Sequence, residues 1–157
     1  MATKIGIGFS EHLNAEIAAK DAAFLSKTIL NEDTIDLAII FSSSHYQPQK
    51  TFPILTKVLN TTKIIGSSTA GIILPDAIKT KGIAVLTIHS DDMEFGVGSV
   101  NHLKTQDSFQ AGSLLAKNSL NDYKSQGRQA FLFFSDTQMA NHSNFLKGLQ
   151  SVLGNIF

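Results

Sequence analysis

The residues best suited to bind a small molecule form the stretch Gly66-Ser67-Ser68-Thr69-Ala70-Gly71. Residues 63–66, just before the hydroxyl side chains, are rich in isoleucine and predict a strand. Open α/β sheets bind ligands in the loops that follow their strands. Glycine lets the backbone approach a bound group closely, and hydroxyl groups both donate and accept hydrogen bonds. The stretch therefore predicts a ligand-binding loop at the end of a strand.

Polar residues follow three other predicted strands in the same way. Ser10 follows residues 4–9 and leads into Glu11 and His12, Ser42 follows residues 35–41, and Ser135 follows residues 129–134. Serine is a common turn residue, so for any one of these loops turn chemistry is the better explanation. The convergence of four such loops is what favours a pocket. The predicted ligand-binding residues are Ser42, Ser43, His45, Tyr46, Gly66, Ser67, Ser68, Thr69, Ala70, Gly71, Ser135 and Asp136.

A serine hydrolase is the alternative that these residues leave open. Residues 66–70 nearly match the nucleophile elbow, but Ala70 stands where the elbow has its second glycine. The elbow also needs a helix directly after it, whereas β-branched residues and a proline follow here. In this alternative Ser67 or Ser68 is the nucleophile, His45 the base and Asp136 the orienting group. The main hypothesis has no catalytic residue.

The sequence lacks the motifs of phosphate-binding, dinucleotide-binding and metal sites. The spacing of Gly66 and Gly71 fits a phosphate-binding loop, but the Lys-Ser/Thr pair that should follow is absent. Gly6 and Gly8 begin a dinucleotide fingerprint whose third glycine would fall at Glu11. The five histidines show no metal-ligand spacing, and the chain has no cysteine. We expect neither a metal nor a cofactor.

Composition narrows the class of protein. The 157 residues carry no net charge, which argues against nucleic acid and anionic membranes as partners. Apolar residues make up 43% and charged residues 17%, as in a globular domain. The N-terminus lacks the apolar stretch of a signal peptide, and no apolar run approaches the ~20 residues of a membrane span. We expect a single cytoplasmic domain over residues 1–157.

The pattern of elements predicts an α/β fold with a mixed, mostly parallel sheet, helices on both faces and one antiparallel hairpin. The hairpin is expected to join residues 81–89 to residues 93–100. The first helix is capped by Asn14 and ends near Asn31, and its inner face is expected to consist of Ile17, Phe24, Leu25, Thr28 and Ile29, with Ala18 and Ala22 beside them. The other helices are expected to start between Pro48 and Pro53, to span residues 107–126 before Gly127, and to end at Gly154.

Residues 37–65 and 130–157 resemble each other at an offset of 93, which indicates an internal repeat. Two β-α-β units that share only their general pattern are the alternative. The repeat and the apolar Ile156 and Phe157 predict a chain that continues beyond residue 157. Ile156 and Phe157 should then lie in or beside the sheet, and an exposed strand edge or apolar surface is expected, which a homodimer can cover.

Three segments of the chain resemble the N-terminal half of the FIST (F-box and intracellular signal transduction) domain family. They are residues 36–42 with His45 and Tyr46, residues 64–71 followed by 82–88, and residues 130–136 followed by 146–149 and by 153–154. Ser67 and Ile72 depart from the family pattern, which usually has cysteine and glutamate at these positions.

The resemblance implies a sensory module of a signal-transduction protein that binds small ligands, with amino acids suggested, and does not turn them over. It also implies a missing C-terminal half or a downstream signalling domain as partner. A third hypothesis is an interaction module that dimerises through the predicted hairpin of residues 81–100.

Overall fold

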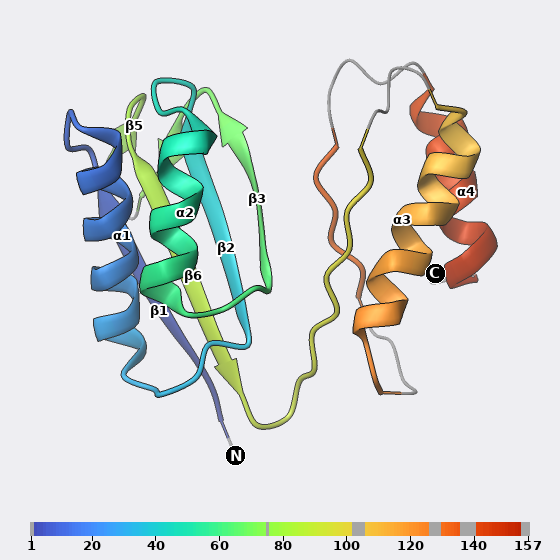
Figure 1. The fold of residues 1–157 in the computed structure, drawn as a ribbon, viewed down its shortest axis with the longest axis horizontal. Coiled ribbons are helices and arrows are strands. Elements are labelled where there is room, and N and C mark those ends of the chain that lie inside the picture. Colours follow the sequence, from blue (N-terminus) through green and yellow to red (C-terminus); the bar gives the residue numbers. More distant parts are fainter. Residues whose placement is uncertain (1, 75, 102–105, 126–129, 136–140, 155–157) are drawn as a thin grey trace. The chain divides into compact units, whose positions relative to one another are not determined.

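The structure is a computed structural model, and it describes residues 2–74, 76–101, 106–125, 130–135 and 141–154. The chain forms two compact units, Met1–Met93 (unit 1) and Glu94–Phe157 (unit 2), which are described separately below (Figure 1). Within the described ranges, no helix combines the length and apolar character that crossing a membrane requires.

Unit 1 is built on a four-stranded sheet. Its strands are β1 (Thr3–Ser10), β2 (Leu37–Ser43), β3 (Ile64–Thr69) and β6 (Ile83–Ser90), in the order β1-β6-β2-β3. Strand β6 is antiparallel to both β1 and β2, and β3 is parallel to β2. Consequently β1, β2 and β3 run in one direction and end at one edge of the sheet. A separate pair of short strands consists of β4 (Ile72–Ile73) and β5 (Ile78–Lys79).

The mixed α/β class is confirmed, but two details of the predicted sheet are wrong. Two of its three strand pairings are antiparallel, so the sheet is not mostly parallel. The predicted hairpin is also absent, because residues 93–100 form no strand and β6 pairs with β1 and β2 instead. Dimerisation through residues 81–100 stays a prediction, although these residues do not form the expected hairpin. Residues 130–134 are likewise not part of a strand.

The helices of unit 1 begin and end close to the predicted residues. Helix α1 (Ala15–Leu30) starts at Asn14, whose side chain accepts hydrogen bonds from the first-turn amides. Helix α2 (Pro48–Leu59) has Pro48 in its first turn, where proline is tolerated. Asn31 and Asn60 end the two helices in the left-handed conformation that asparagine adopts more readily than most residues.

The predicted buried face of α1 is wrong. Ile17, Phe24, Leu25 and Ile29 are all more than 40% exposed. The residues packed against the sheet are small ones on the opposite side of the helix, together with Leu30 at its end. The buried residues of α1 are Ala18, Ala19, Ala22, Ala23, Ser26 and Leu30.

Small residues are needed on α1 because the helix lies unusually close to strand β1. A β-carbon on Gly8 would come within 1.9 Å of the Ala22 carbonyl oxygen, and one on Gly6 within 2.0 Å of the Ser26 carbonyl oxygen. Both helices share one core with the sheet, formed by residues such as Leu55, Ile40 and Val85. They therefore lie on the same face of the sheet (Figure 1), so helices on both faces are not confirmed.

Unit 2 contains α3 (Ser108–Asp122) and α4 (His142–Leu153), which pack against each other. Their shared core is Ala111, Leu115, Ala116, Phe145, Leu149 and Leu153. Asp107 and Asn141 cap their N-termini, and Gly154 ends α4 as predicted. Helix α3 ends at Asp122, four residues earlier than expected. The expectations about Gly127, Ile156 and Phe157 fall outside the described residues.

Candidate functional site

The ends of β1, β2 and β3 form what we call the carboxyl-end edge of the sheet. In the strand register, Ser10 is opposite Ile83, Ile83 is opposite Ser42, and Ser42 is opposite Ser68. Three of the four predicted polar segments therefore meet at one edge of unit 1. Of the fourth, Ser135 belongs to unit 2 and Asp136 lies outside the described residues.

The glycine-serine stretch is mainly strand and not loop. Strand β3 continues to Thr69 and pairs with β2 along its whole length, with Gly66 opposite Ile40. A β-carbon on Gly66 would come within 1.9 Å of the Ile40 carbonyl oxygen, so sheet packing already accounts for this glycine. The turn begins at Ala70, where the Thr69 hydroxyl donates to the Gly71 carbonyl at 2.7 Å.

The serines at this edge differ in how much of their hydroxyl is available. Ser67 and Ser68 are exposed on β3, and the Ser67 hydroxyl donates to the Ser68 carbonyl at 2.9 Å. Ser42 makes only a long local bond of 3.3 Å to the Ser43 carbonyl. Ser43 is buried, and its hydroxyl accepts from the Gly82 amide at 3.2 Å. A ligand at this edge would therefore meet Ser67 and Ser68 first, whereas Ser43 holds β2 to the start of β6.

Tyr46 is part of the core, whereas His45 is exposed. The Tyr46 hydroxyl donates to the His12 carbonyl at 2.8 Å and so ties the end of β2 to the end of β1. Burial, followed by the negative charge of Glu11, raises the pKa of Tyr46. The Lys81 ammonium lies 5.9 Å from the centre of the Tyr46 ring, within the range of a cation–π contact.

Three charged residues at the same edge were not among the predicted site residues. The Lys79 ammonium lies 3.0 Å from a Glu11 carboxylate oxygen, and Lys81 sits just before β6. Glu11 directly follows β1, and the rule about strand ends had placed it in one of the four polar loops without naming it as a ligand-binding residue. The two lysines could not be found this way, because the position of β6 between β1 and β2 was not predicted.

The arrangement needed for a serine nucleophile is not formed. Among the residues that the structure describes, no hydrogen bond joins His45 to Ser67 or Ser68. The proposed orienting group, Asp136, lies outside those residues. Within the residues that the structure describes, no group of three or more side chains is arranged to hold a metal ion.

Comparison with known families identifies the family of the chain. Residues 36–157 match the family described as the FIST N domain, a match that includes most of unit 1 and all of unit 2. The chain belongs to the FIST N domain family. This confirms the resemblance, and FIST domains are sensory, non-enzymatic modules of signal-transduction proteins. No curated protein matches the chain.

Two positions where this FIST N domain departs from the expected family pattern have different surroundings. Ser67 is exposed on β3, so it presents a hydroxyl at the carboxyl-end edge. Ile72 is 6% exposed in β4. A carboxylate at position 72 would be buried, which is costly without a partner.

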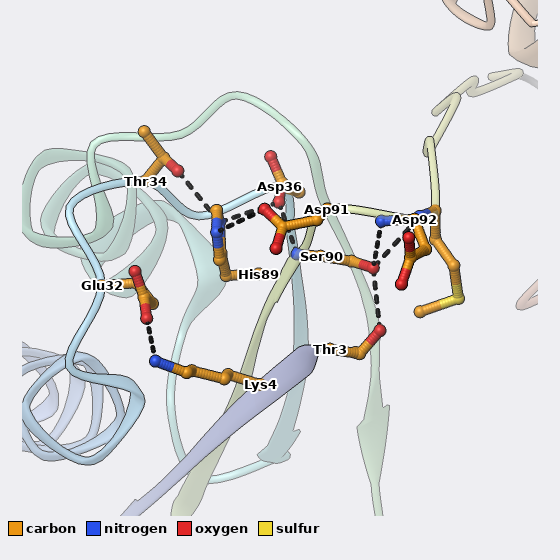
Figure 2. A network of polar contacts seen from close by, with 10 residues as sticks. Thr3, Lys4, Glu32, Thr34, Asp36, His89, Ser90, Asp91 and Asp92 are labelled. Carbon is orange, nitrogen blue, oxygen red and sulfur yellow. Dashed lines mark hydrogen bonds and ion pairs between the residues drawn. The ribbon is translucent and has the colours of Figure 1, made fainter. Parts of the chain in front are cut away.

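The opposite edge of the FIST N sheet carries a polar network centred on His89, which the sequence analysis did not identify (Figure 2). Its Nδ1 lies 3.1 Å from an Asp36 carboxylate oxygen and 3.0 Å from the Thr34 hydroxyl. Its Nε2 lies 3.8 Å from an Asp91 oxygen. The imidazole is thus held between two carboxylates.

Neighbouring contacts connect this network to the end of unit 1. The Ser90 amide donates to Asp36 at 2.8 Å, and the Ser90 hydroxyl accepts from the amides of Asp92 and Met93 (Figure 2). Beside it, Lys4 on β1 forms an ion pair with Glu32. These hydrogen bonds all join residues of unit 1, so the network stabilises the sheet at the point where the chain leaves unit 1.

An open pocket of about 400 Å³ lies at the C-terminal end of α1. Its lining mixes one lysine with two acidic residues, and one of these, Glu32, already pairs with Lys4. The lining residues are Phe24, Lys27, Thr28, Asn31, Glu32 and Asp33. None of them belongs to the carboxyl-end edge, so this pocket is not the predicted site.

Proposed function

We propose that this FIST N domain is a cytoplasmic sensory module that binds a small zwitterionic metabolite, such as an amino acid, at the carboxyl-end edge. The observation that carries the proposal is the presence of exposed hydroxyls on β3 at the same edge as Glu11, Lys79 and Lys81. A zwitterion needs donors for its carboxylate and an acceptor for its ammonium group, and this edge offers both kinds of group.

Each end of such a ligand has a natural partner. The hydroxyls of Ser67 and Ser68 and the Lys81 ammonium are donors for a carboxylate. The Glu11 carboxylate accepts from an ammonium group, provided that its ion pair with Lys79 opens. Exposed ion pairs contribute only about 0–1 kcal/mol, and Glu11 is about half exposed, so opening it costs little.

Binding without turnover fits both the family and the local chemistry. The serines lack a histidine base in the described structure, and a serine hydroxyl without a base is a weak nucleophile. We expect ligand binding to be passed on to a C-terminal FIST half or to a downstream signalling domain.

The test is a thermal-shift screen of the purified chain against the twenty amino acids and related metabolites. A ligand present at 100 times its dissociation constant stabilises the folded state by about 2.7 kcal/mol. We expect at least one compound to raise the melting temperature. The double variant Ser67→Ala/Ser68→Ala should abolish this rise.

The matched control is Thr62→Ala, which removes an exposed hydroxyl just before the other end of β3. It should leave the ligand-induced rise intact. A screen in which no compound raises the melting temperature, or a double variant that keeps the full rise, would count against the proposal.

A further inference from the structure

Units 1 and 2 share a packing motif that extends the repeat seen in the sequence. In unit 1, Gly6 and Gly8 lie against α1. In unit 2, a β-carbon on Gly96 would come within 2.5 Å of the Ser119 carbonyl oxygen on α3, and one on Gly98 within 2.4 Å of the Ser119 amide nitrogen. Each unit therefore begins with a Gly-x-Gly segment pressed against its first helix.

The buried positions of the helices also correspond. At the offset of 93, five buried residues of α1 fall on five buried residues of α3: Ala18, Ala19, Ala22, Ala23 and Ser26 on Ala111, Gly112, Leu115, Ala116 and Ser119. At an offset of 94, the buried residues of α2 fall on those of α4: Thr51, Leu55 and Leu59 on Phe145, Leu149 and Leu153. The two pairs of helices therefore present equivalent inner faces.

Residues 130–135 correspond to β2. In β2, Ala38 and Ile40 belong to the core beneath the helices. At the offset of 93 these positions become Phe131 and Phe133, which pack against the core of unit 2. The Phe133 ring lies 5.8 Å from the Phe145 ring, whereas Leu132 between the two phenylalanines is 59% exposed. This alternation is typical of a strand with one face on a helical layer.

Unit 2 differs from unit 1 in the strand between these segments. In unit 1, β6 lies between β1 and β2 and forms a ladder with each. In the described part of unit 2, no strand lies between residues 94–100 and 130–135, which we call the flanking segments (Figure 1). Gly96, Gly98, Val100, Phe131 and Phe133 make no backbone–backbone hydrogen bond there, although all are partly buried. In unit 1, the corresponding backbone groups of β1 and β2 are paired by β6.

We propose that unit 2 binds one extended strand between its flanking segments, antiparallel to both, as β6 binds in unit 1. The partner is an uncharged segment of seven or eight residues in which apolar residues alternate as they do in β6. Ile83, Val85 and Thr87 of β6 face the helical layer and are fully buried. A charged side chain at such a position would be buried without a partner.

The test is hydrogen–deuterium exchange of the whole chain, with and without a synthetic peptide of the β6 sequence, residues 83–90. Peptide binding should slow amide exchange at least tenfold in both flanking segments. A second peptide with aspartate in place of the residues equivalent to Val85 and Thr87 should give no protection.

A matched pair of variants locates the binding. Leu132→Pro removes one amide donor from the proposed ladder, whereas Leu132→Ala keeps the amide. The peptide should protect the Ala variant and not the Pro variant.

Light scattering without peptide separates the sources of a strand. Protection that appears only in a dimer would mean that a second copy supplies the strand, which supports the proposed binding site between the flanking segments. Four results would overturn the proposal: no protection in either flanking segment, protection in only one of them, equal protection by the aspartate peptide, or full protection of the peptide-free monomer.

Discussion

The close approach of α1 to β1 predicts that Gly8→Ala strongly destabilises unit 1. The new β-carbon would lie 1.9 Å from the Ala22 carbonyl oxygen and 2.6 Å from the Ser26 amide nitrogen. Both atoms belong to the helix backbone, so no side-chain rotation can relieve the clash. Helix α1 would have to move by about 1.5 Å to restore ordinary contact, and overpacking of this kind costs about 1–3 kcal/mol. We expect the upper end of that range.

Thermal and urea unfolding of the variant and the wild type measure this effect. For a chain of this size, 1 kcal/mol corresponds to about 2–4 °C, so the melting temperature should fall by about 5–10 °C. Gly71→Ala is the matched control, since its nearest atom, the Lys79 carbonyl oxygen, is 3.3 Å away, and it should change the melting temperature by less than about 2 °C. A Gly8→Ala variant as stable as the wild type would refute the close packing of α1.

Three further predictions concern stability. Asn14→Ala and Asn141→Ala each remove a helix N-cap, and each should lower the free energy of unfolding by about 1 kcal/mol in urea titrations. Thr87→Val removes a buried hydroxyl bonded at 2.8 Å to the Ser26 hydroxyl and should cost about 1–2 kcal/mol, whereas Thr80→Val on the surface should cost almost nothing. The Lys4–Glu32 hydrogen bond raises the pKa of Lys4 and lowers that of Glu32. Its contribution should therefore be lost as the pH falls below 4.5, the ordinary Glu pKa, and again above the raised Lys4 pKa, so that the melting temperatures of Lys4→Met and wild type differ at pH 7 and draw together as the pH is lowered below 4.5.

Local sequence signals predicted the helix boundaries of unit 1 well, because these boundaries are determined by residues at the helix ends. Asn14 and Pro48 mark helix starts by side-chain capping and by a fixed backbone angle, and neither depends on distant residues. The inner face of α1 could not be predicted in this way. A stripe of large apolar residues normally marks the buried face, but Gly6 and Gly8 bring the helix so close to the sheet that only alanine and serine fit there. The large residues are left on the outside.

The candidate site was predicted in part for the same reason. The rule about strand ends correctly brought the segments after β1, β2 and β3 together, since these strands share one direction. It could not distinguish Ser43, which is used to hold Gly82, from the exposed Ser67 and Ser68, because that difference depends on where β6 lies.

The placement of β6 is the feature that local patterns could not supply. Its alternating apolar residues fit an edge strand in a hairpin as well as a central strand, and nearness in sequence favoured the hairpin with residues 93–100. What decides between them is residue type on the neighbouring strand. Gly6 is opposite Thr87 and Gly8 is opposite Val85, so β1 contributes no side chain at these two positions, and β6 must fill the space beneath α1 there. The same Gly-x-Gly pattern at Gly96 and Gly98 faces α3. A strand beside Gly96 and Gly98 would have to fill the equivalent space beneath α3 in unit 2.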